Sequence, residues 1–148
     1  MATQHDRNSS LTLTRLFDAP VEGVWQAFSD PELLSQWYGS PGKLEDVSID
    51  FRVGGRWDST TVIGENRIPQ GGVYSLIEAP TYLKYDSLDP GEDPNGPHEV
   101  MEFRLTERDG NAELTFTQSG NLPPEEYAGG LKDGWTGFFD ALQTVVEG

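Results

Sequence analysis

The sequence predicts an α+β fold in which a curved antiparallel sheet of seven strands wraps around one long C-terminal helix. Most of the chain between residues 44 and 118 alternates apolar and polar side chains with the period of two that strands require. Beyond residue 124, apolar side chains instead recur at the spacing of an amphipathic helix. Two helix-start signals near the N-terminus add two short helices after the first strand.

The first strand is predicted at residues 11–17, and the two short helices follow it. Pro20 marks a first helical position, and Asp30-Pro31 has the order of a capping residue followed by a proline. Because both helices are short, we expect them to close one end of a larger structure. Each has a one-sided apolar stripe: Val21, Val24, Trp25 and Phe28 in the first, and Leu33, Leu34, Trp37 and Tyr38 in the second.

Six further strands are predicted at residues 44–51, 56–63, 72–77, 82–88, 99–106 and 112–118. Gly54-Gly55 predicts a sharp reversal or a bulge, where a side chain would obstruct the backbone. Asp109-Gly110-Asn111 predicts a tight turn that joins the last two strands. Residues 64–71 and 89–98 are rich in Gly, Pro, Asn and acids, which predicts mobile surface loops.

The last predicted element is a helix over residues 124–146, which at about 1.5 Å per residue would be roughly 34 Å long. Its glycines each lower helix propensity by roughly 1 kcal/mol relative to alanine, so we expect a compensating feature. A close approach to the sheet or room for a ligand would supply one. The glycines are Gly129, Gly130, Gly134 and Gly137, and the apolar stripe is Leu131, Trp135, Phe138, Leu142 and Val145.

Composition limits the classes of function. The 148 residues predict a single domain at 10–148 behind a disordered tail at 1–9. The chain has no cysteine, which excludes disulfides, thiolate metal sites and cysteine nucleophiles. The 25 acidic and 10 basic residues, with a net charge of −15, disfavour nucleic acid and anionic membranes as partners. Without a signal-peptide run or a membrane-length apolar segment, we expect a cytoplasmic protein with no membrane insertion.

Four strings, in order along the chain, resemble the activator-of-Hsp90-ATPase-like (AHSA1-like) branch of the START-like, or Bet v 1-like (SRPBCC), superfamily. They are FDAPVEGVWQAFSDPELLSQWYG at 17–39, VSIDFRVGGRW at 47–57, GGVYSLIEAPTYLKY at 71–85, and GW with the apolar residues that follow at 134–142. The resemblance covers nearly the whole chain and implies a START-like helix-grip fold with a cavity. Family members include lipid and polyketide binders, cyclases, hydroxylase domains and cochaperone domains, so the resemblance selects no single activity. The cochaperones carry an additional N-terminal domain for Hsp90 binding, whereas about ten polar residues precede the first strand here.

The candidate ligand-binding residues are large apolar side chains expected on the concave sheet face or on the helix face opposite it. For each of them, plain core packing is the alternative. They are Trp37, Tyr38, Phe51, Trp57, Tyr74, Tyr85, Met101, Phe103, Phe116, Trp135, Phe138 and Phe139.

Arg56 and His98 are the candidate polar anchors. An inward guanidinium, from Arg56, Arg52 or Arg67, would hold a carboxylate or phenolate, and an outward arginine paired with acids is the alternative. Because a bulge at Gly54-Gly55 would shift the alternation of inward and outward side chains by one residue, either residue 56 or residue 57 could face inward. His98 in a solvent-exposed loop is the alternative to an acid or base. We expect no metal and no cofactor, because the predicted domain has no second histidine and no phosphate or dinucleotide fingerprint.

The sequence therefore predicts a binding protein for a small hydrophobic or aromatic molecule, held between the sheet and the C-terminal helix. A cavity enzyme of the cyclase, dehydratase or hydrolase type is one alternative, with its catalytic residues unassigned because no catalytic constellation is visible. A protein-interaction or cochaperone-like module, with a protein partner or as a homodimer, is the other alternative.

Overall fold

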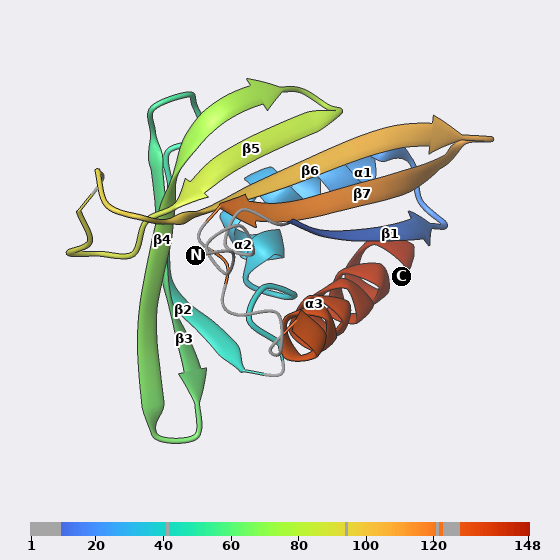
Figure 1. Ribbon diagram of the computed structural model, residues 1–148. Helices are drawn as coiled ribbons and strands as arrows, with labels where there is room; N and C mark the ends of the chain where they lie inside the picture. Colours follow the sequence, from blue (N-terminus) through green and yellow to red (C-terminus); the bar gives the residue numbers. More distant parts are fainter. Residues whose placement is uncertain (1–9, 41, 94, 121, 123–127) are drawn as a thin grey trace.

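The computed structural model describes residues 10–40, 42–93, 95–120, 122 and 128–148, and its described part is a seven-stranded sheet with three helices (Figure 1). The strand order is β1-β7-β6-β5-β4-β3-β2, with every neighbouring pair antiparallel. This confirms the predicted fold class and the predicted order of elements. The elements are β1 (Leu11–Phe17), α1 (Val21–Ser29), α2 (Pro31–Leu34), β2 (Lys43–Ile49), β3 (Arg56–Ile63), β4 (Asn66–Glu78), β5 (Tyr82–Ser87), β6 (Glu99–Arg108), β7 (Asn111–Gly120) and α3 (Ala128–Glu147).

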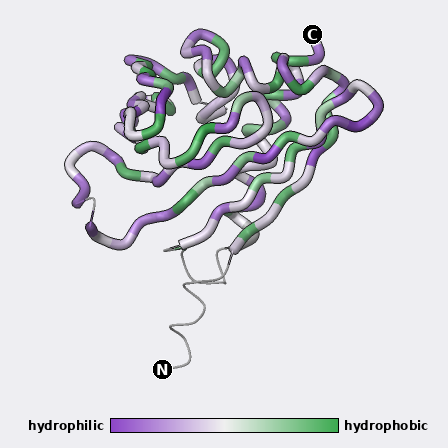
Figure 2. Tube along the Cα trace, turned by 90° about the horizontal axis from the view of Figure 1, so that it is seen from above, coloured by the Kyte–Doolittle hydropathy of each residue, from purple (hydrophilic) through white to green (hydrophobic). Residues whose placement is uncertain are grey.

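The sheet bends sharply, and the helices lie inside the bend. Figure 1 shows β2, β3 and the start of β4 running across the direction of β5, β6 and β7. Register shifts in β4 between Tyr74 and Leu76, and in β2 between Glu45 and Ser48, accompany the bend. Along the strands, hydrophobic and hydrophilic residues alternate (Figure 2), as a sheet with one solvated face requires.

The predicted loop at residues 64–71 is wrong, because β4 begins at Asn66 and forms a long hairpin with β3. The chain reverses at Gly64, which has a φ of +62°, so residue 66 already pairs with Ile63. The polar composition of this arm hid its strand character because its apolar residues are few and partly exposed, as at Ile68. The loop after β5 is observed where it was predicted, apart from residue 94, which lies outside the described residues.

The start of α2 matches its prediction, but the helix ends at Leu34, earlier than predicted, and Trp37 and Tyr38 lie in the turns that follow it. The Asp30 carboxylate accepts hydrogen bonds from the backbone N–H groups of Glu32 (2.9 Å) and Leu33 (3.5 Å), which caps α2. Pro20 stands one position before the first helical residue of α1. The predicted start of the long helix at 124, like the predicted tail at 1–9, lies outside the described residues. Of the helices that are described, none is both long and apolar enough to cross a membrane.

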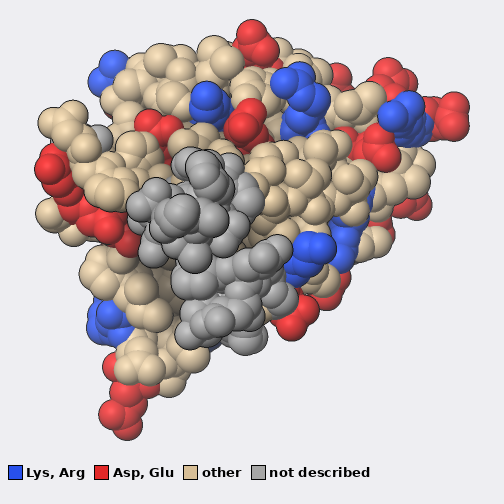
Figure 3. All heavy atoms as spheres, in the orientation of Figure 1, with Lys and Arg blue, Asp and Glu red and all other residues tan. Residues whose placement is uncertain are grey.

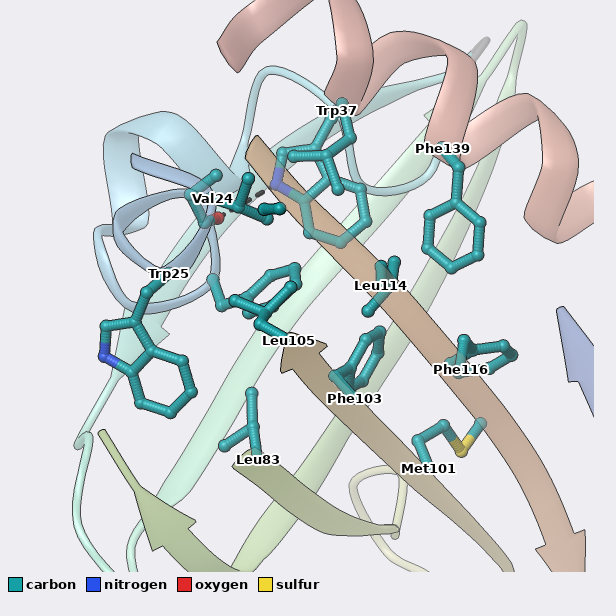
Figure 4. Close-up of a cluster of buried hydrophobic side chains, with 14 of the residues drawn as sticks. Val24, Trp25, Trp37, Leu83, Met101, Phe103, Leu105, Leu114, Phe116 and Phe139 are labelled. Carbon is teal, nitrogen blue, oxygen red and sulfur yellow. Dashed lines mark hydrogen bonds between the residues drawn. The ribbon is translucent and has the colours of Figure 1, made fainter. Parts of the chain in front are cut away.

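An aromatic core joins the three helices to the concave face of the sheet (Figure 4). Phe103, on the interior strand β6, lies with its ring centroid 5.0 Å from that of Phe116 and 5.1 Å from that of Phe28. The Trp37 indole N–H donates to the backbone carbonyl of Ala27 at 2.9 Å, which ties the turns after α2 to the last turn of α1. The short helices therefore seal this end of the core, as their apolar stripes predict.

Candidate functional site

A groove of about 300 Å³ lies between the first turns of α3 and the inner face of the sheet, and we call it the α3 groove. The β3–β4 hairpin forms the opposite wall, and the ends of β5 and β7 and the start of β6 form the floor. Its lining residues are Tyr38, Trp57, Ile68, Gln70, Gly71, Ser87, Asp89, Glu99, Met101, Gln118, Gly130, Leu131, Gly134, Trp135 and Phe138.

The predicted cavity residues separate into three groups. Tyr38, Trp57, Met101, Trp135 and Phe138 line the α3 groove. A core void of about 20 Å³, little more than one water molecule requires, is bounded by Trp37, Tyr74, Tyr85 and Phe103 together with Tyr38 and Trp57. Phe51, Phe116 and Phe139 line neither space: the last two are buried in the core, and Phe51 packs beside Trp25 and Tyr74.

Two glycines of α3 leave room in the wall of the groove. A Cβ atom placed on Gly130 or Gly134 would meet no heavy atom within 4 Å, and both residues line the α3 groove. Close packing against the sheet is therefore not the reason for these glycines. Gly137, one turn further along, also has open space at its Cβ position but does not line the groove. Gly130 and Gly134 thus lower the helix propensity of α3, and they leave open space beside the aromatic residues of the groove.

A hydrogen-bonded chain of three side chains crosses the floor of the groove. The Trp135 indole N–H donates to Oε1 of Gln118 at 2.9 Å, and Nε2 of Gln118 donates to Oε1 of Glu99 at 2.9 Å. Gln118 is only 2% exposed. Because an indole N–H can only donate, it fixes the orientation of the Gln118 amide, so that the amide presents its NH₂ group to Glu99.

Two carboxyl groups face the groove in a setting that disfavours their charged forms. Burial raises the pKa of Glu99, helped by the charges of Asp89 and Glu92 and opposed by the hydrogen bond from Gln118. Burial also raises the pKa of Asp89, which accepts a hydrogen bond from the backbone N–H of Gly71 at 3.1 Å. The charge of Glu92 raises the pKa of Asp89 further, and that of Arg56 lowers it.

Neutral polar groups line the groove and the adjoining core void, and Tyr38 and Trp57 border both spaces. The hydroxyl oxygens of Tyr38 and Tyr85 are 3.3 Å apart, and burial raises the pKa of Tyr38 to about 12, so Tyr38 stays protonated at neutral pH. The buried Trp57 indole nitrogen has no acceptor among the residues that the structure describes. Nε2 of Gln70 donates to the Thr61 hydroxyl at 2.5 Å. The wall of the groove is thus amphipathic rather than purely apolar.

The predicted polar anchors lie outside the α3 groove. Trp57 takes the inward position and is 5% exposed, while Nη2 of Arg56 donates to Asp58 at 2.7 Å and to the Leu88 carbonyl at 2.9 Å. His98 has its Nδ1 2.9 Å from the Gly96 carbonyl oxygen and its Nε2 3.7 Å from an Asp86 oxygen. It lines a neighbouring polar hollow of about 170 Å³, together with Ser87, Asp89, Glu92, Pro97 and Glu99.

The other arginines considered for an inward role pair with surface acids. Nε of Arg52 donates to Asp50 at 2.8 Å, and Nη1 of Arg67 donates to Glu45 at 2.9 Å. Within the described part of the chain, no three His, Asp or Glu side chains lie close enough together to hold a metal ion.

Sequence reasoning missed Glu99 and Gln118, although a signal for both was present. Residues 99, 101 and 103 share one face of β6, and residues 114, 116 and 118 share one face of β7. Each series ends in a polar residue at a position whose neighbours are buried. A polar residue at an inward position indicates either a satisfied core network or a site, and here it belongs to a hydrogen-bonded floor.

The raised pKa of Glu99 predicts a pH-dependent effect of Glu99→Gln on stability. When the folded pKa lies above the unfolded value, the stabilising contribution is present below the unfolded pKa and is lost as pH rises through the folded pKa. Glu99→Gln should therefore raise the free energy of unfolding at neutral pH, by less than about 1 kcal/mol because the carboxyl is partly exposed and screened. The gain should vanish below about pH 4, near the ordinary glutamate pKa.

Denaturant unfolding across this pH range measures the effect. Glu107→Gln, at the exposed end of β6, removes the same charge and is the control. An equal gain from Glu107→Gln would assign the effect to the overall acidity of the chain instead of to the groove.

The chain belongs to the family described as activator of Hsp90 ATPase homolog 1-like proteins, because the model of that family matches residues 18–147. The resemblance inferred from the sequence is thereby confirmed. No curated protein matches the chain.

Solved structures share the fold. A protein from Nitrosomonas europaea aligns with a TM-score of 0.83 at 24% identity, over 93% of this chain and 94% of that one. A protein from Chromobacterium violaceum aligns with a TM-score of 0.82 at 23% identity, over 95% and 99%. An AHSA1-like protein from Aeromonas hydrophila aligns with a TM-score of 0.76 at 20% identity, over 94% of this chain and 92% of that one. At these identities the likeness shows the fold alone.

Proposed function

We propose that this protein binds a small molecule with an aromatic or apolar body in the α3 groove. The observation that carries the proposal is the open space beside Gly130 and Gly134, on the same helix turns that bring Leu131, Trp135 and Phe138 to the groove. A volume of about 300 Å³ is at the lower end of the range for small-molecule sites.

The aromatic side chains offer surfaces for a flat ligand. The rings of Trp135 and Phe138 are 5.1 Å apart at an interplanar angle of 69°, and Phe138 lies 5.2 Å from Tyr38. Rings held by such edge and tilted contacts within a core keep their positions, so a ligand would enter a largely preformed wall. The polar groups of the floor would then orient the ligand.

Filling the groove from its helical wall tests this proposal. Gly134→Leu should place a side chain in the groove and weaken binding of an aromatic ligand by at least about tenfold, since it removes the volume that the ligand needs. Gly137→Leu is the matched control, because it makes the same change on the same helix, also into open space, outside the groove. Both variants should gain helix propensity. A loss of binding in Gly134→Leu alone would therefore not be explained by a change in stability.

Amide-resolved NMR titration with tryptophol, a neutral indole alcohol, measures the binding. We expect shifts at groove residues in the unmodified protein and in Gly137→Leu, and their loss in Gly134→Leu. Equal binding by both variants would place the ligand elsewhere and overturn the proposal.

The two alternative functions stay predictions. A cavity enzyme is favoured by one observation, the raised pKa of Glu99 in a groove, which suits a general acid or base. An interaction module is favoured by the family description, which names activation of the Hsp90 ATPase, and an Hsp90 ATPase assay with added protein would test it. A cytoplasmic location and the lack of nucleic-acid partners also stay predictions from composition.

A further inference from the structure

We propose that the natural ligand of the α3 groove is a cationic amphiphile, an aromatic or alkyl-aromatic amine, whose ammonium group binds Glu99 with Asp89 beside it. This inference rests on the proposed function and adds the chemical class of the ligand. It follows from hydrogen-bond directions in the floor of the groove and from the signs of the charges that line it.

The hydrogen-bonded floor leaves one acceptor oxygen available on a residue that lines the groove and the polar hollow. Trp135 fixes the Gln118 amide, and Gln118 donates to one oxygen of Glu99. The other oxygen of Glu99 has no donor among the described residues. An ionised carboxylate only accepts hydrogen bonds, so the complementary head group must donate. A ligand with a carboxylate head would instead bring two acceptors together.

The charges that face the groove are negative. The only carboxyl side chains among its described lining residues are those of Asp89 and Glu99, and that lining contains no lysine, arginine or histidine. Arg56 partly compensates Asp89 from outside, and Glu92 adds a further negative charge. For Glu99 the neighbouring charges are those of Asp89 and Glu92, both of the same sign. A bound ammonium would therefore neutralise the less compensated of the two carboxylates.

The polar hollow extends the space available to the head group. It shares Ser87, Asp89 and Glu99 with the α3 groove, so both carboxyl groups stand where the two spaces meet. Of these two spaces, Trp135 and Phe138 of α3 line only the groove. An amphiphile would thus place its ring against α3 and its amine at this junction. Acidic side chains gather over the loop between β5 and β6 beside it (Figure 3), where they would attract a cation.

Three indole compounds that differ in head group provide the test: tryptamine, a cation; tryptophol, a neutral alcohol; and indoleacetate, an anion. In NMR titrations of the full chain at neutral pH, tryptamine should bind at least about tenfold more tightly than tryptophol, and indoleacetate most weakly. Glu99→Gln should reduce the preference for tryptamine over tryptophol to near unity, because a neutral amide no longer pairs with the ammonium group. Glu107→Gln, which removes the same charge outside the groove, should keep the preference.

The outcomes separate this inference from the proposed function. Tryptophol binding as tight as tryptamine binding, or tighter binding of indoleacetate, would overturn the cationic ligand and leave groove binding intact. Equal loss of the amine preference in Glu99→Gln and Glu107→Gln would show that overall charge, not the groove carboxylate, selects the cation, and would also overturn it. Absence of binding by all three compounds would overturn both proposals.

Discussion

Phe103→Ala is expected to lower the free energy of unfolding by about 3–5 kcal/mol, the largest effect predicted for this protein. Phe103 is 2% exposed on the interior strand β6, and the centroid of its ring lies within 6.1 Å of those of Phe28, Tyr85, Phe116 and Trp135. Its removal therefore deletes contacts with both layers of the core. Since domains of this size are stable by about 5–15 kcal/mol, the variant should be marginal.

The cavity left by Phe103→Ala would be deepened by the core void of about 20 Å³ that Phe103 already borders. Next to existing empty space, fewer neighbouring atoms can move in to fill the cavity. The loss in free energy of unfolding should therefore lie toward the upper end of the range. Chemical unfolding followed by tryptophan fluorescence measures the loss. Phe51→Ala, at a partly exposed ring, is the matched control and should lose clearly less. Equal losses would contradict a central role for Phe103.

Most of the fold could be predicted from the spacing of apolar residues, because that spacing reflects which side chains of each element are buried. The alternation of Met101, Phe103 and Leu105 along β6 predicted both a strand and its inward face, and all three side chains are buried. It failed where a strand leaves the core. Residues 66–69 form the exposed end of the β3–β4 hairpin, where no apolar alternation is required, and the proline at 69 and glycines at 71 and 72 made the segment resemble a loop.

The candidate site was harder to predict because the same residue types build cores and ligand sites. Phe116 and Trp135 both appeared as candidates, but Phe116 is fully buried and Trp135 also reaches the groove. Which of two inward aromatic residues borders open space depends on how α3 crosses the sheet, and that crossing is set by contacts distant in sequence. The polar floor was missed for a related reason: Gln118 and Glu99 come together only through strand pairing of β6 with β7.

Trp135→Phe is expected to lower the free energy of unfolding by about 1–3 kcal/mol, although an aromatic ring remains at the position. The indole ring lies 4.2 Å from that of Phe116 and 5.7 Å from that of Phe139, and a phenyl ring keeps part of this packing. The hydrogen bond is lost completely. Oε1 of Gln118 would then be a buried acceptor without its donor, and desolvation of an unsatisfied group dominates the loss.

Two comparisons isolate the hydrogen bond from the change in ring size. Trp25→Phe makes the same substitution in the core, at an indole nitrogen with no hydrogen bond to the described residues, and should have a smaller effect. In a Gln118→Met background, Trp135→Phe should also have a smaller effect, because the acceptor is gone, and the difference is the coupling energy of the pair. A Trp135→Phe loss that stays the same in that background would show that the indole acts by packing alone. In that case the Trp135 indole would not be what orients the Gln118 amide. The hydrogen bond from Gln118 to Glu99 would then depend on the Glu99 carboxylate alone.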